Sequence, residues 1–147
     1  MVVFTGGFFD PPHRGHINLF KEAKALGDKL VVMVHRDECC VKKKGYCFMP
    51  LEDRKAILES VKYIDQVIVC PNNCSLTMEH ILEVVKPDIY AKGGDRTPEN
   101  MPKDEVETCK RLGIKVVYGV GGGKIQSSSW LVKKAKAKLT EEKQTSK

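Results

Sequence analysis

Short apolar runs alternate with amphipathic stretches from one end of the chain to the other. Each apolar run is short and rich in β-branched or aliphatic residues, which is typical of strands buried on both faces of a parallel sheet. The pattern predicts strands over Val2–Thr5, Leu30–His35, Gln66–Cys70, Asp88–Ala91 and Lys115–Tyr118.

The stretches between these runs carry helical signals. Ile17, Phe20 and Ala23 share one helix face, and Gly27 is a typical stop for that helix. The other helices are predicted from residues that mark helix ends. Proline, acidic residues and serine mark their starts, and a proline that follows marks an end. They are expected from Leu51 behind Pro50, over about Thr77–Val85, from about Pro102 and from the serine cluster at Ser127.

This strand–helix order predicts an α/β fold with right-handed crossovers. We expect a single Rossmann-like domain whose five-stranded parallel sheet has helices on both faces. The domain should span residues 1–139, and residues 140–147 should form a disordered tail. Such a sheet binds ligands beyond the carboxyl ends of its strands, so the residues after each strand matter most.

The first predicted strand runs into a glycine turn, Gly6-Gly7, and then into the motif His13-Arg14-Gly15-His16. The glycines allow close approach of the backbone to a ligand, and a helix begins just beyond. Two imidazoles three residues apart at a helix start lie on one face, where both can donate to phosphate oxygens. A turn with two surface histidines is the alternative, and the combined pattern makes it improbable.

A second anion site is predicted after the fifth strand. The glycine-rich stretch Gly119–Gly123 leads into a helix start that carries Ser127, Ser128 and Ser129. Hydroxyls and free backbone amides at a helix start bind anions. A simple helix cap would need one serine, so three favour phosphate binding.

These motifs resemble the signature of the cytidylyltransferase-like nucleotidyltransferase superfamily, in which G-x-F-D precedes H-x-G-H. The resemblance implies that His13 and His16 hold a nucleoside triphosphate and stabilise the transition state at its α-phosphorus. It also implies that Gly7, Phe8 and Phe9 line the phosphate site with their backbone, with Gly15 between the histidines. Asp10 would help to fix the loop, or the lysine and metal nearby.

The resemblance continues at Lys42-Lys43-Lys44-Gly45, which looks like the family's lysine loop, and at the L-E-x-R helix start that contains Arg54. Lysines on a mobile loop can neutralise phosphates as a site closes. A solvated charge run is an equal alternative for Lys42, and a catalytic role is favoured for Lys43 or Lys44. Arg54 could instead pair with a carboxylate to support the fold.

After the fourth strand, Lys92-Gly93-Gly94-Asp95 begins a K-G-G-D-x-x-P-E sequence that resembles the nucleotidyltransferase half of ADP-heptose synthase. In the superfamily this region meets the base and ribose, and the S-S-S type helix start contacts the triphosphate. The D-P-P-H sequence that begins at Asp10 looks more like nicotinate-mononucleotide adenylyltransferases.

The resemblance implies a nucleotidyltransferase that moves AMP from ATP onto a phosphorylated small molecule such as a sugar 1-phosphate and releases pyrophosphate. It implies Mg²⁺ as cofactor and a homodimer. The alternatives are a glycerol-3-phosphate cytidylyltransferase, an adenylyltransferase for flavin or nicotinate mononucleotide, and a non-catalytic nucleotide-binding module. Their partners would still be nucleotides.

Composition narrows the remaining classes. The formal charge is +6, but much of it lies in C-terminal lysines without interleaved aromatic residues, so nucleic-acid binding is not expected. No apolar run approaches the roughly 20 residues of a membrane span. A cytoplasmic protein is expected. The six cysteines form no C-x-x-C pair, and none is interpreted as sitting beside a histidine at zinc-ligand spacing, so free thiols and no protein metal site are predicted. A Cys70–Cys74 pair that responds to oxidation is a minor alternative.

Overall fold

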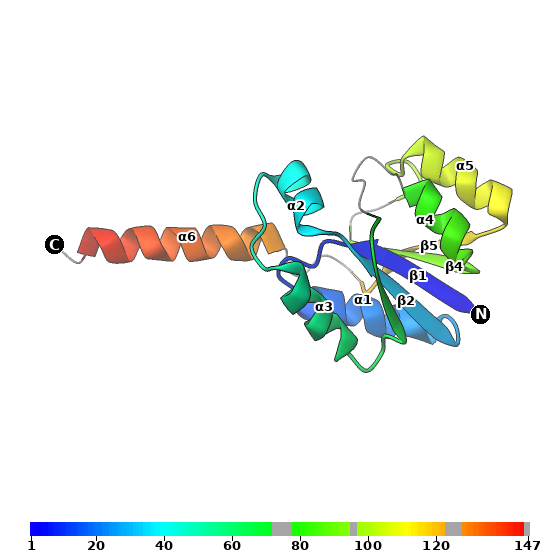
Figure 1. Cartoon of the computed structure of the whole chain (residues 1–147), viewed down its shortest axis with the longest axis horizontal. Helices are drawn as coiled ribbons and strands as arrows, with labels where there is room; N and C mark the ends of the chain where they lie inside the picture. The colour runs from blue at the N-terminus through cyan, green and yellow to red at the C-terminus, as the bar shows by residue number, and fades with distance from the viewer. Residues whose placement is uncertain (72–77, 95–96, 123–127, 146–147) are drawn as a thin grey trace.

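The computed structural model describes residues 1–71, 78–94, 97–122 and 128–145. Its five strands form one parallel sheet in the order β3-β2-β1-β4-β5 (Figure 1). The strands are β1 Val2–Gly7, β2 Lys29–Val34, β3 Gln66–Val69, β4 Ile89–Gly93 and β5 Lys115–Val120. The predicted sheet is confirmed, and each predicted strand is present with only its ends shifted.

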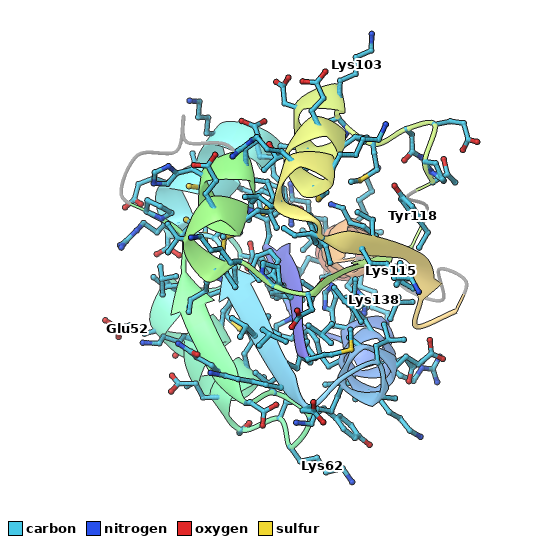
Figure 2. The ribbon with its side chains drawn as sticks, turned by 90° about the vertical axis from the view of Figure 1, so that its right-hand side faces the viewer. Glu52, Lys62, Lys103, Lys115, Tyr118 and Lys138 are labelled. Atoms are coloured by element: carbon cyan, nitrogen blue, oxygen red, sulfur yellow. The ribbon has the colours of Figure 1, made fainter. Side chains whose placement is uncertain are left out.

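Six helices connect or follow these strands in the described part of the chain. They are α1 Arg14–Ala25, α2 Asp37–Lys44, α3 Leu51–Glu59, α4 Met78–Val85, α5 Lys103–Leu112 and α6 Ser128–Thr145. Helices α1 and α3 cover one face of the sheet, and α4 and α5 cover the other (Figure 1). Figure 2 shows the same layers from the side. The prediction of helices on both faces is confirmed.

The core consists of two apolar clusters, one on each face of the sheet. Side chains alternate along a strand, so Val3 and Leu30 face α1 and α3 while Phe4 and Val31 face α4 and α5. All four are at most 5% exposed. The strands are therefore apolar throughout because both of their faces are covered.

Two segments differ from the sequence expectation. The lysine loop is a short helix, α2, which ends at Gly45 with the left-handed φ of 87°. Its polar composition gives no clear apolar stripe, which is why periodicity did not reveal it. At the C-terminal end, α6 continues beyond Thr140 to Thr145. The boundary between domain and tail stays a prediction.

The order of the strands places a switch point at the carboxyl end of β1. The chain leaves β1 for β2 on one side, while β4 pairs with β1 on the other side. A crevice at such a point is where open α/β sheets bind ligands. No helix among the described residues is long and apolar enough to cross a membrane.

Candidate active site

The first turn of α1 holds the two motif histidines in a capping box. The Nδ1 atom of His13 accepts a hydrogen bond from the backbone N–H of Gly15 at 3.1 Å. The Nδ1 atom of His16 accepts one from the backbone N–H of His13 at 3.2 Å. Because both Nδ1 atoms are acceptors, we assign the ring protons to Nε2. The capping box uses the backbone N–H groups of His13 and Gly15, so what the helix start offers a ligand is the two ring N–H donors and its positive dipole end.

Packing fixes the orientation of these rings. The rings of His13 and His16 stack with centroids 3.8 Å apart and planes 23° from parallel. Phe9 meets the ring of His16 edge-on at 4.9 Å and packs against Phe20 on its other side. Phe9 is 4% exposed and has a φ of 51°, a left-handed conformation that is unusual for a bulky residue. Phe9 thus supports the ring of His16 with its side chain, a role that the sequence reasoning missed.

Both histidines are neutral in this structure near neutral pH. Burial, the neighbouring His13 and Lys44 together lower the pKa of His16 to about 3. Burial also lowers the pKa of His13. The two rings therefore meet a ligand as neutral N–H donors, a role that suits phosphate oxygens.

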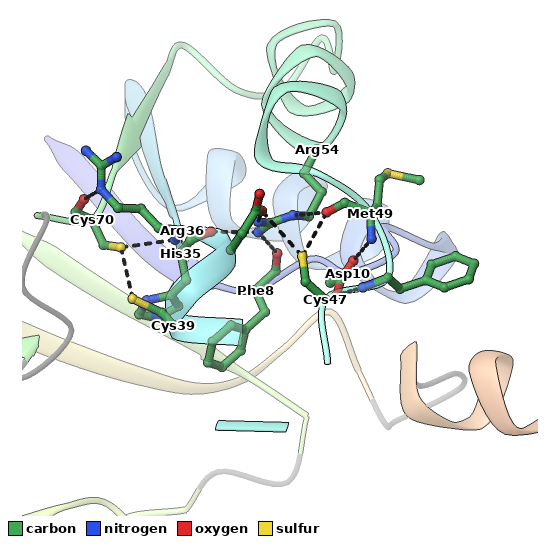
Figure 3. Close-up of polar contacts among 11 residues, drawn as sticks. Phe8, Asp10, His35, Arg36, Cys39, Cys47, Met49, Arg54 and Cys70 are labelled. Atoms are coloured by element: carbon green, nitrogen blue, oxygen red, sulfur yellow. Dashed lines mark hydrogen bonds and ion pairs between the residues drawn. The ribbon is translucent and has the colours of Figure 1, made fainter. Parts of the chain in front are cut away.

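Asp10 of the G-x-F-D motif is fully buried and fixes the loop that follows α2 (Figure 3). Its carboxylate accepts the backbone N–H groups of Phe48 at 2.8 Å and Met49 at 2.6 Å. These contacts favour the loop-fixing role among those considered for this residue.

Arg54 joins the ends of β1 and β2 to α2, although its side chain is completely buried. Its guanidinium donates to the backbone oxygens of Phe8 at 2.9 Å, His35 at 2.6 Å and Met49 at 2.8 Å. It also pairs with the carboxylate of Asp37 at 2.6 Å (Figure 3). The structure therefore supports the interpretation of Arg54 as a framework residue.

The lysines of α2 differ in their distance from the histidines. Lys44 is half-buried and lies over the ring of Phe8, with its Nζ 5.2 Å from the ring centroid. Its charge contributes, after burial and His13, to the lowered pKa of His16. Lys43 is exposed. Of the two lysines predicted to be catalytic, Lys44 is the one whose positive charge lowers the pKa of His16.

At the end of β4, the side chain of Lys92 turns toward the α5 face. Its Nζ donates to the hydroxyl of Tyr90 at 2.8 Å and lies 3.8 Å from a buried carboxylate oxygen of Glu105. These contacts hold the Lys92 side chain against Tyr90 and Glu105. The predicted contact of Lys92 with the nucleotide stays a prediction. Gly94 has a φ of 61°, which glycine adopts without strain. Asp95 lies outside the described residues.

The loop after β5 rests directly on α1. A side chain at Gly121 would place its Cβ 2.9 Å from the backbone of Leu19, so only glycine fits there. A Cβ added at Gly93 would also lie 3.1 Å from one of the methyl groups of Leu19. The ends of β4 and β5 therefore meet the same turn of α1. Of the predicted serines, Ser127 lies outside the described residues, and only the backbone of Ser128 and Ser129 is described.

Two further clusters of chemical groups were not recognised from the sequence. His35, Cys39 and Cys70 have ligand atoms that all lie within 4.8 Å of one another. The i, i+4 spacing of His35 and Cys39 is a sequence signal for such a cluster, and the prediction of free thiols did not take it into account. The second cluster comprises Asp10, Cys40 and Cys47. There, burial and the hydrogen bond to Asp37 raise the pKa of the Cys47 thiol to about 12.

Relatives of known sequence match most of the chain. An FAD synthase of Pyrococcus abyssi is 42% identical over 116 residues, which cover 78% of this chain and 75% of the relative. The bifunctional protein HldE of Hahella chejuensis is 37% identical over 123 residues, which cover 82% of this chain. The chain spans only 23% of that bifunctional protein.

Solved structures share the fold. A lipopolysaccharide core biosynthesis protein from Thermoplasma volcanium is 32% identical, with a TM-score of 0.66 over 81% of this chain and 93% of the other. A pantoate-beta-alanine ligase from Francisella tularensis is 15% identical with a TM-score of 0.56, which indicates a shared fold alone. The cytidylyltransferase-like family model matches residues 4–141. The chain therefore belongs to the cytidylyltransferase-like family, and it is a nucleotidyltransferase.

Proposed function

We propose that this enzyme transfers AMP from ATP onto a phosphorylated small molecule, such as a sugar 1-phosphate, and releases pyrophosphate. The observation that carries the proposal is the histidine pair at the start of α1. His13 and His16 present two Nε2–H donors at the N-terminal, positive end of a helix dipole, at the switch point of the sheet.

The reaction needs no nucleophile from the protein. An oxygen of the acceptor phosphate attacks the α-phosphorus in line and forms the new P–O bond. The bond from the α-phosphorus to the bridging oxygen breaks, and its electron pair leaves with pyrophosphate. The chain contributes by positioning and by charge stabilisation. His13 and His16 donate to oxygens of the triphosphate, and Lys44 adds a positive charge close to them.

Mg²⁺ belongs to the proposal as a companion of the triphosphate. Mg²⁺ prefers oxygen ligands, and in nucleotide sites it is held through one or two carboxylates plus the phosphates. Each of the two ligand clusters found among the described residues contains two cysteine sulfurs. These residues do not fit Mg²⁺, so we assign none of them to it and derive no step through it.

The choice of a sugar 1-phosphate rests on the K-G-G-D sequence at Lys92–Asp95 and on the likeness to the bifunctional protein HldE. The second candidate acceptor is flavin mononucleotide. It is favoured by the FAD synthases, whose length this chain covers to 75%. The predicted homodimer and the cytoplasmic location stay predictions.

The test is pyrophosphate release with Mg²⁺ present. ATP, CTP and GTP are each combined with heptose 1-phosphate, glycerol 3-phosphate, flavin mononucleotide and nicotinate mononucleotide. We expect release with ATP and heptose 1-phosphate, and its loss in His16→Ala. Release with a different pair alone would replace the proposed substrates. Nucleotide binding without release for any pair would favour the non-catalytic module.

A further inference from the structure

A cluster of one imidazole and two sulfurs lies outside the proposed phosphate site. His35 follows β2, Cys39 lies in the first turn of α2, and Cys70 follows β3. Both cysteines are buried, with exposed fractions of 8% and 5%. We call His35, Cys39 and Cys70 the thiol–imidazole cluster (Figure 3). Two adjacent strand ends and a helix start therefore bring three soft ligand atoms to one place.

The distance between the sulfurs fits a shared metal ion. The Sγ atoms of Cys39 and Cys70 are 3.7 Å apart. A disulfide would bring them to about 2.05 Å. Two thiolates bound to one tetrahedral zinc ion at about 2.3 Å each would lie about 3.8 Å apart. The third ligand atom, on the ring of His35, lies within 4.8 Å of both sulfurs.

The surroundings of the cluster are those that metal ligands need. The backbone N–H of Arg36 donates to the Sγ of Cys70 at 3.2 Å, and the Nε of Arg36 donates to the Cys70 carbonyl at 2.9 Å. The ring of His35 stacks on Phe8 with centroids 4.4 Å apart, which limits its rotation. Contacts of this kind orient metal ligands and tune them.

The other described cysteines do not have a second sulfur and an imidazole together within ligand distance. Burial and the nearby Glu105 raise the pKa of Cys109, which stands in neither ligand cluster. Cys47 is held as a protonated thiol beside Asp37, as its pKa of about 12 indicates. Cys109 is 2% exposed and is thus a matched buried cysteine for comparison with Cys70.

We propose that the reduced protein binds one Zn²⁺ ion through the Nε2 or Nδ1 of His35 and the thiolates of Cys39 and Cys70. Two sulfurs and one imidazole form a ligand set that zinc uses, with a fourth position left for water or another donor. In the structure Cys39 is disulfide-bonded, so the prediction of free thiols is wrong for this residue, whereas Cys40, Cys47, Cys70 and Cys109 are free. That bond and the metal compete for the same sulfur, so the proposal concerns the chain after reduction.

The test uses the full, tag-free chain kept in a metal-free phosphine reductant. It is loaded with Zn²⁺, desalted and analysed for metal content per chain. We expect about one Zn²⁺ in the wild type and in Cys109→Ser and His80→Ala, and none in Cys39→Ser or Cys70→Ser. For His35→Ala we expect a loss of affinity above the roughly 10–100-fold that an outer-shell change causes. Equal zinc content in wild type and Cys70→Ser would overturn the proposal.

A second measurement uses the wild type alone, so it does not depend on the folding of a variant. Titration with Co²⁺ should produce the charge-transfer absorption of thiolate ligands and the visible bands of a tetrahedral ion, and Zn²⁺ should remove both. Oxidation with diamide before loading should abolish them. Octahedral Co²⁺ bands without thiolate absorption, or full binding after oxidation, would each overturn the assignment. Neither readout involves nucleotidyl transfer, so failure here leaves the proposed function standing, and the reverse also holds.

Discussion

Two histidine sites lie at the carboxyl edge of the same sheet, and their surroundings give them different chemistry. In one, His13 and His16 turn their Nδ1 atoms to backbone N–H groups and keep Nε2–H donors for a ligand. In the other, His35 lies within 4.8 Å of two cysteine sulfurs and stacks on Phe8. One site offers protons to anions, whereas the other places a nitrogen among atoms that bind soft cations.

The pKa values alone do not distinguish these sites. Burial, His13 and Lys44 lower the pKa of His16 to about 3, while burial, Arg54 and Lys43 lower that of His35 to about 4. Both rings are therefore neutral near pH 7. The comparison teaches that the groups around a neutral imidazole, backbone amides at one site and cysteine sulfurs at the other, decide which ligands it suits.

The largest expected effect concerns the residue that both sites share. Arg54 donates to the backbone oxygens of Phe8 and His35, so Arg54→Met should disturb both strand ends. The backbone oxygens of Phe8, His35 and Met49 would lose their donor. Each buried acceptor left unsatisfied costs about 1–3 kcal/mol, and urea unfolding would measure the summed loss. Arg111→Met, which removes an exposed pair with Glu83, is the control and should cost about 1 kcal/mol or less. Equal losses in the two variants would contradict the framework role.

The next effect separates the two histidine sites by activity. His16→Ala removes a donor to the triphosphate, and loss of one such donor lowers kcat by about 10²–10³. Pyrophosphate release under saturating substrates measures kcat, and thermal unfolding checks the fold. His80→Ala, a change at an exposed position on α4, should leave kcat unaltered. A folded His16→Ala enzyme with normal kcat would remove the basis for the proposed mechanism.

A smaller effect compares two lysines of one helix. Lys44→Ala should raise the KM for the nucleoside triphosphate roughly tenfold or more, because a hydrogen bond to a charged group contributes about 1.5–3 kcal/mol. Lys42→Ala should change the KM little, because Lys42 is exposed on α2. Steady-state kinetics on both variants measures the difference. If Lys42 matters as much as Lys44, the field of the whole helix rather than one side chain binds the phosphates.

The smallest effect, measured per pH unit, is a pH dependence of the free energy of unfolding. The folded pKa of His16 is about 3, below its ordinary value of 6.5. The unfolded chain therefore binds a proton that the folded chain excludes, and stability falls as the pH drops from about 6.5 toward 3. The slope from one such group is at most about 1.4 kcal/mol per pH unit. Urea midpoints at several pH values should show a shallower slope in His16→Gln, and an unchanged slope would exclude His16 as its source.

Sequence reasoning recovered the parts of this molecule that depend on local pattern. Strands buried on both faces are apolar throughout, and a histidine pair spaced by three at a helix start was recognisable from its letters. Helix α2 was missed because its stability comes from contacts with distant residues, chiefly Asp37 with Arg54. The run of lysines in α2 has no hydrophobic periodicity, so the sequence pattern does not indicate these tertiary contacts.

The parts of the site that were missed depend on pairs far apart in the chain. Phe9 supports His16 with a side chain whose direction follows from an unusual backbone conformation, and no sequence pattern specified it. Cys39 and Cys70 are separated by 31 residues, and only the adjacency of β2 and β3 brings them together. The sequence predicted a parallel sheet without an order of its strands, because the spacing of strands along the chain does not reveal which strand ends are neighbours.

The capping box also governs how the catalytic rings react with labelling reagents. Acylating and alkylating reagents attack an unprotonated imidazole nitrogen, and in this structure those nitrogens, the Nδ1 atoms of His13 and His16, accept backbone hydrogen bonds. A reagent can reach them only when the first turn of α1 opens, which is a local unfolding event. The labelling rate of this pair therefore measures how often the first turn of α1 opens. A bound triphosphate that holds the turn closed should slow the labelling.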